Sequence, residues 1–229
     1  IAHSVVKELR HTLLGEADDS DASGRARAEV AAARGRITDP EAYDLYLRGR
    51  HLMTAADDGA ERAQEMFRQA IERAPTFALP YAGLGSVYVL QSWRASRDRG
   101  ETVSKARAAL ARALELDDQL CEALVLSAQI KLYFDWDFAG AGDDLRRAIE
   151  QNPSSDVAYR EYANWLAIMG RFEEGIAAAR QAQALDPLSV DATHELGWEL
   201  LATGRPAEAV VEFRRALDLN PSWIWGYIK

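Results

Sequence analysis

A pattern of apolar and small residues recurs along this chain with a period close to 34 residues. The clearest markers are Pro153, Pro187 and Pro221, which are evenly spaced (187 − 153 = 34 and 221 − 187 = 34). Within each period the apolar residues follow helical spacing, which predicts two amphipathic helices joined by a short turn. One such pair cannot bury its apolar face alone, so a repeat of this length indicates a solenoid of stacked units.

Each unit places a small residue in each of its two helices. In the last unit these residues are Gly197 and Ala209, and one period earlier they are Ala163 and Gly175. Small side chains let paired helices approach closely, and large apolar residues such as Phe213 fill the space between them. Glycine in the connecting turns is expected to end the first helix in the left-handed conformation.

The spacing and the small positions resemble the tetratricopeptide repeat (TPR), which implies an all-α fold, a right-handed α-solenoid of antiparallel helix pairs. Five units are expected over residues 39–221, at about 39–75, 76–118, 119–153, 154–187 and 188–221. Residues 1–38 are expected to form an amino-terminal helix and a polar linker, and residues 222–229 to begin a truncated sixth unit. Because the chain starts at Ile1 and stops within that unit, we expect it to be a fragment of a longer protein.

The second and third units carry distinctive segments between their helices. The second has nine extra residues near Gln91–Ser104, which are expected to form a solvated loop. The third carries Asp135, Trp136 and Asp137 between its helices. Turn carboxylates are usually solvated, and we expect such a turn here, with Trp136 packed against the stack.

Composition and charge limit the kinds of partner and the cellular location that we expect. The 229 residues are 48% hydrophobic and 28% charged, with a formal net charge of −9, which is typical of a soluble globular protein. A net acidic surface repels phosphate backbones, so nucleic acid is not an expected partner. No run of roughly 18 apolar residues predicts membrane insertion. The cytoplasm is favoured as the compartment, with a periplasmic part of a membrane-anchored protein as the alternative.

The sequence carries no recognisable catalytic or cofactor motif. The sequence has no glycine-rich phosphate loop and no nucleophile elbow. Its four histidines form no close metal-ligand pair with one another or with the single cysteine, Cys121. We therefore expect a chain that is not an enzyme and holds no cofactor and no metal.

In TPR proteins the first helix of each pair lines the concave face, and the resemblance implies partner-binding residues at the matching positions. These are Tyr43, Tyr46, Arg50, Gln129, Arg160, Asn164, His194 and Trp198. Arg160 and Asn164 match one unit of the clamp that captures carboxy-terminal peptides. The next unit departs from that clamp with Asp191 and Glu195, so no such clamp is predicted.

The insertion in the second unit suggests another surface. Residues 91–112 carry six basic and two acidic side chains, which gives a local charge of +4 (6 − 2 = 4). One interpretation is a basic docking patch for an acidic partner, at Arg94, Arg97, Arg99 and Lys105. The other is scattered solvated charge.

These patterns favour a protein–protein interaction scaffold that binds a peptide or protein segment. The stretches Pro40–Arg50 and Tyr133–Asp137 resemble those of bacterial regulatory and signalling proteins, in which TPR arrays are fused to winged-helix, kinase or cyclase domains. Two alternatives stay open. One is a sensory domain that binds a small ligand in the concavity. The other is an oligomerisation scaffold that forms a homo-oligomer through the open repeat ends.

Overall fold

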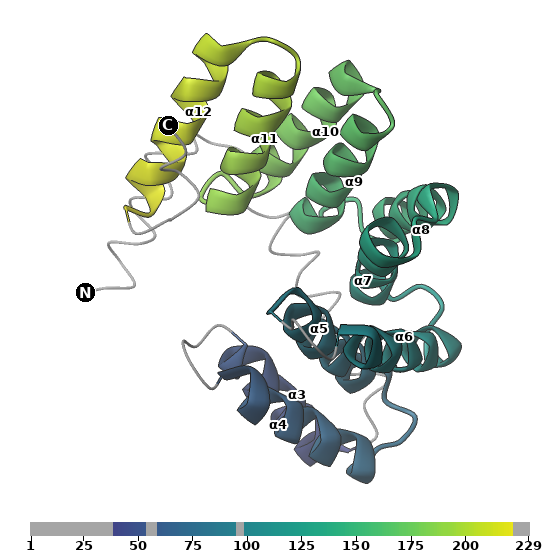
Figure 1. The fold of residues 1–229 in the computed structure, drawn as a ribbon. Helices are drawn as coiled ribbons and strands as arrows, with labels where there is room; N and C mark the ends of the chain where they lie inside the picture. The colour runs from purple at the N-terminus through teal and green to yellow at the C-terminus, as the bar shows by residue number, and fades with distance from the viewer. Residues whose placement is uncertain (1–38, 54–58, 95–98, 222–229) are drawn as a thin grey trace, which may run out of the picture.

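The computed structural model describes residues 39–53, 59–94 and 99–221, and it confirms the all-α solenoid of helix pairs (Figure 1). The first helices of the pairs are α3 (Pro40–Leu52), α5 (Ala78–Arg94), α7 (Cys121–Ile130), α9 (Asp156–Ile168) and α11 (Val190–Ala202). The second helices are α4 (Gly59–Arg73), α6 (Arg99–Leu116), α8 (Phe138–Gln151), α10 (Phe172–Leu185) and α12 (Pro206–Leu219). A short π-helix, η1 (Lys131–Asp135), continues α7.

Local signals fix the ends of the helices. Ser155 and Ser189 cap α9 and α11, because each Oγ accepts a hydrogen bond from the backbone N–H three residues later, at 3.2 and 3.1 Å. The turns after these helices contain Gly170 and Gly204, both with φ of +74°. Glycine adopts this left-handed conformation without steric cost, as predicted. Pro206 then occupies the first turn of α12, where its missing N–H is tolerated.

Close helix approach at small residues holds each pair together. The ring of Phe67 on α4 is fully buried between Gly49 on α3 and Gly83 on α5. A Cβ atom at either glycine would lie 2.5 or 2.6 Å from the Phe67 ring, well inside van der Waals contact. Gly197 on α11 repeats this arrangement, since a Cβ atom there would lie 2.5 Å from the ring of Phe213 on α12. Backbone therefore packs directly on an aromatic ring at these crossings.

The first helices lie on the inner side of the array. Neighbouring first helices contact one another, from α3 with α5 through to α9 with α11. The second helices α4, α6, α8 and α10 instead pack on their own partners and on the first helix of the next pair. Elements on the inside of a curve are drawn together, so α3, α5, α7, α9 and α11 form the concave face, along the curve visible in Figure 1.

The π-helix η1 absorbs one extra residue that the sequence pattern did not reveal. The two small positions of the third pair, Ala128 and Ala141, are 13 residues apart (141 − 128 = 13), against 12 in the next pair (175 − 163 = 12). The backbone N–H of Trp136 donates to the carbonyl of Lys131, five residues back, and Trp136 adopts a φ of +56°. The prediction that Trp136 packs against the stack is wrong, because its side chain is 73% exposed.

The insertion in the second pair lengthens helices, and the prediction of a loop over Gln91–Ser104 is wrong for most of its length. Helix α5 has 17 residues and α6 has 18, compared with 13 in α9 and 14 in α10. The segments 1–38 and 222–229 lie outside the described residues, and the division into five units stays a prediction. No helix of the described residues is long and apolar enough to cross a membrane.

Replacing Gly49 with alanine should destabilise the array, because the new methyl group would overlap the buried Phe67 ring. Overpacking costs about 1–3 kcal/mol, against a gain of up to about 1 kcal/mol in helix propensity. Gly100→Ala is the matched control, since a Cβ there meets nothing within 4 Å. Urea unfolding followed by circular dichroism should show a loss for Gly49→Ala and none for Gly100→Ala. Equal stability of the two variants would contradict the packing described.

Candidate functional site: the concave face

The amino-terminal half of the concave face carries an ion pair that joins two helices across α5. Arg50 Nη1 on α3 donates to Glu122 Oε2 on α7 at 3.0 Å and to the Tyr46 hydroxyl at 2.9 Å. Tyr46 is buried against Phe67, and Tyr43 is half-buried one turn earlier on α3. Two of the predicted binding residues, Tyr46 and Arg50, are therefore brought together, with Glu122 as a partner that the sequence did not suggest.

Burial and neighbouring charges shift the pKa values of all three side chains in this cluster. Burial, aided by the charge of Glu122, raises the pKa of Tyr46 to about 12, so its hydroxyl stays protonated at neutral pH. Burial also raises the pKa of Glu122, although Arg50 opposes that effect. The Arg50 pKa is raised by Glu122, and the guanidinium stays charged. Opposite charges thus cancel in this half of the face.

Arg160 and Asn164 lie on α9 in the carboxy-terminal half, where both are half-buried, and Gln129 is half-buried on α7. Arg160 Nη1 pairs with Glu161 Oε1 at 3.1 Å, and Glu161 is only 6% exposed. Burial acts to lower the Arg160 pKa, yet the pKa is raised because nearby carboxylates stabilise the positive charge. The carboxylates that act on Arg160 are those of Glu161, Asp191, Glu195 and Asp156.

Two glutamates on one face of α11 have raised pKa values. Burial, together with Glu161, raises the pKa of Glu195 to about 7. One turn later, burial raises the pKa of Glu199 to about 7. Glu199 is 2% exposed, packs against Gly175 of α10, and has no hydrogen-bond partner for Oε2 among the described residues. A carboxyl group without a partner is expensive to bury in its charged form.

His194 and Trp198 form an aromatic pair at the carboxy-terminal end of the face. Trp198 Nε1 donates to His194 Nε2 at 2.9 Å, and both rings lie against Phe213. Burial lowers the pKa of His194, which favours the neutral imidazole that can accept this hydrogen bond. Trp198 is 37% exposed and presents part of its ring to solvent.

Comparisons with known proteins agree with this geometry. A family model described as "Tetratricopeptide repeat" matches residues 190–222. A solved structure of TTC0263, a thermophilic TPR protein from Thermus thermophilus, superposes with a TM-score of 0.67 at 17% identity, covering 81% of this chain and 94% of that chain. Residues 190–222 thus form a tetratricopeptide repeat, and the chain has the fold of a TPR array.

Other similar proteins extend the comparison of this TPR chain. Small glutamine-rich tetratricopeptide repeat-containing protein 2 of Mycosarcoma maydis is 32% identical over 107 residues, which are 46% of this chain and 30% of that protein. Transcriptional regulator HilA of Salmonella typhimurium is 24% identical over 179 residues, which are 78% of this chain and 26% of that protein. The TPR chain thus spans under a third of the length of either relative. The structure of YrrB, described as a TPR protein with an unusual peptide-binding site, superposes with a TM-score of 0.50 at 20% identity, covering 80% of this chain and 88% of that chain.

The predicted basic patch is only partly within the described TPR array. Arg97 lies outside the described residues, as does the side chain of Arg94. Arg99 is exposed at the start of α6, and Lys105 pairs with Glu101 on the same helix at 2.5 Å. That pairing reduces the positive charge available to a partner, and the patch stays a prediction.

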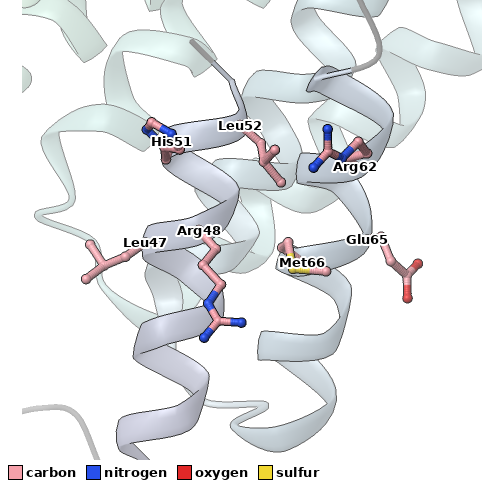
Figure 2. Close-up of a pocket in the computed structure, with 7 residues that line it drawn as sticks. All are labelled: Leu47, Arg48, His51, Leu52, Arg62, Glu65 and Met66. Carbon is pink, nitrogen blue, oxygen red and sulfur yellow. The ribbon is translucent and has the colours of Figure 1, made fainter. Parts of the chain in front are cut away.

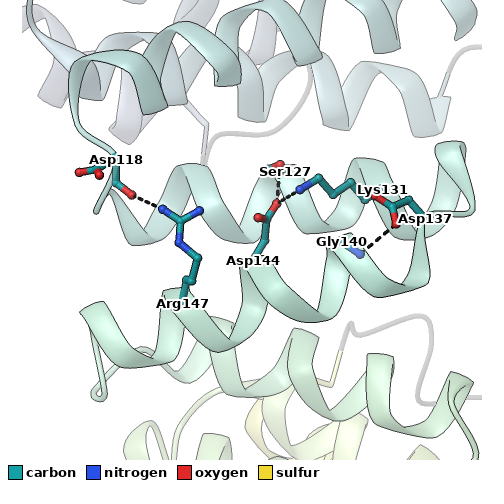
Figure 3. Close-up of polar contacts among 7 residues, drawn as sticks. All are labelled: Asp118, Ser127, Lys131, Asp137, Gly140, Asp144 and Arg147. Atoms are coloured by element: carbon teal, nitrogen blue, oxygen red, sulfur yellow. Dashed lines mark hydrogen bonds and ion pairs between the residues drawn. The ribbon is translucent and has the colours of Figure 1, made fainter.

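Polar residues between the helices of the third pair have structural roles (Figure 3). Asp144 on α8 is 6% exposed and accepts hydrogen bonds from Ser127 Oγ at 2.7 Å and Lys131 Nζ at 2.6 Å. Asp137 caps α8 by accepting from the Gly140 N–H at 2.9 Å, and Asp135 pairs with Arg107 of α6. No group of three or more potential metal ligands is present among the described residues of the TPR array.

A shallow depression of about 570 Å³ lies between α3 and α4 rather than on the concave face (Figure 2). Leu47, Leu52 and Met66 supply its apolar lining, with charged side chains around them. Both helices belong to the first pair that the structure describes. The depression therefore belongs to the end of the TPR array and not to the candidate site.

Glu199→Gln should stabilise the TPR array above neutral pH and weaken the pH dependence of its stability. The folded chain binds this proton up to a pH of about 7, whereas the unfolded chain releases it near 4.5, so stability falls as the pH rises between these values. The neutral amide removes this effect, which amounts to about 1–3 kcal/mol. Urea unfolding at several pH values checks it, with Glu150→Gln on the exposed surface as control. An unchanged slope in Glu199→Gln would refute the assignment.

Proposed function

We propose that this TPR array is a non-catalytic protein–protein interaction scaffold that binds a peptide or protein segment along the concave face of its first helices. The observation that carries the proposal is the carboxy-terminal half of that face. There Asn164 and Trp198 lie on adjacent first helices, and Trp198 is partly open to solvent. Partly exposed aromatic side chains on a concave surface are the usual anchors of binding energy.

The likeness to transcriptional regulator HilA supports a role within a larger bacterial regulatory or signalling protein. The similarity extends over 78% of this chain, and therefore over several helix pairs. It covers 26% of that regulator, so the array would act beside other domains. In such a protein the array would bind the partner, and a neighbouring domain would carry out the regulatory or signalling activity.

Self-association is a second candidate, and it rests on a different surface. Leu188, Val210 and Val211 at the carboxy-terminal end of the described array are 71%, 44% and 61% exposed. Large exposed apolar side chains leave area that contact with another protein surface would bury. A homo-oligomer through this end would leave the concave face free for a partner.

The concave-face proposal is tested with a pair of matched tryptophan variants of the whole chain. Trp198→Ala should reduce capture of a partner from the source lysate by about tenfold or more, since truncation of an aromatic anchor residue costs about 2 kcal/mol or more. Trp136→Ala removes an equally large but 73% exposed ring at the turn before α8, and it should leave capture unchanged. Circular dichroism verifies that both variants keep their helicity. A partner bound equally by wild type and Trp198→Ala would overturn the proposal.

A further inference from the structure

The two halves of the concave face differ in charge. In the amino-terminal half, the contact between Arg50 and Glu122 pairs one positive with one negative side chain. In the carboxy-terminal half, one cation, Arg160, lies within range of four carboxylates. These are the side chains of Asp156, Glu161, Asp191 and Glu195.

Most of this negative charge has no cation of its own. Glu161 takes the one ion pair that Arg160 forms, at 3.1 Å. Asp156, Asp191 and Glu195 form no ion pair within 4.0 Å with the described residues. Buried Glu199 lies one turn from Glu195, its charge acts on Glu195, and its Oε2 has no hydrogen-bond partner among the described residues.

The same two helices also carry exposed apolar side chains. Val157 on α9 is 41% exposed, and Trp198 and Leu201 on α11 are 37% and 40% exposed. Large apolar side chains at this exposure leave area for a partner to bury. The surface thus combines exposed apolar side chains with an excess of negative charge.

We propose that the concave face of α9 and α11 binds a cationic amphipathic segment of a partner protein, with lysine or arginine side chains beside apolar ones. The inference rests on the proposed function and names the chemical class of the partner. Apolar side chains of the segment cover Val157 and Trp198, while its cations approach Asp191 and Glu195. Charge complementarity of this kind selects partners and speeds their association, and an acidic segment is repelled.

A library of short random peptides, balanced in acidic and basic residues and displayed against the whole 229-residue chain, tests this inference. Selection at a pH of about 8 keeps Glu195 charged, because its pKa is near 7. The selected peptides should be enriched in lysine and arginine next to apolar residues. This enrichment is measured on the wild-type chain, so it does not depend on how any variant folds.

Synthetic copies of the selected peptides then give the dissociation constants of matched variants. Asp191→Asn/Glu195→Gln removes two charges from the site and should weaken binding by about tenfold or more. Glu150→Gln/Glu173→Gln removes two charges from exposed positions on α8 and α10 and should change binding little.

The outcomes separate this inference from the function on which it rests. Peptides of neutral or acidic composition that require Trp198 would overturn the cationic partner but keep the concave-face scaffold. Peptides that bind independently of Trp198 and of the two carboxylates would overturn both. Failure to select any peptide would also contradict both.

Discussion

Close approach of helix backbones to large rings is the constraint on which the array depends. Phe67 occupies the space that side chains would fill at Gly49 and Gly83, and it thereby fixes α3, α4 and α5 at one crossing. Phe213 against Gly197 repeats the arrangement at the other end. Because each pair packs mainly against its neighbours, such crossings set the rotation from one pair to the next and hence the curvature of the described array.

Curvature in turn brings distant side chains together on the inner side. Arg50 and Glu122 are 72 residues apart in sequence, yet they meet at 3.0 Å across α5. In the other half, neighbouring first helices place Asp191 and Glu195 of α11 near Arg160 of α9. The concave face thus obtains its electrostatic character from the solenoid geometry and not from any one helix.

Features that depend on local sequence were predictable. A small residue such as Gly197 indicates a close helix crossing at its own position, and a glycine in a turn indicates a left-handed backbone there. The candidate positions on the first helices followed from the resemblance, but the partner of Arg50 did not, because it depends on curvature accumulated over two pairs. The π-helix was missed because one extra residue is hidden in a variable turn. The buried carboxyl of Glu199 was missed because a glutamate carries no sequence signal of its burial.

Site-specific photo-crosslinking tests the central claim most directly, since it reports which face of the array touches a partner. A photoreactive amino acid is placed at Val157, which is 41% exposed on the concave helix α9, and separately at the exposed Glu150 on the outer helix α8. We expect a crosslinked partner from position 157 and none from position 150. A partner captured from position 150, with none from position 157, would contradict binding on the concave face.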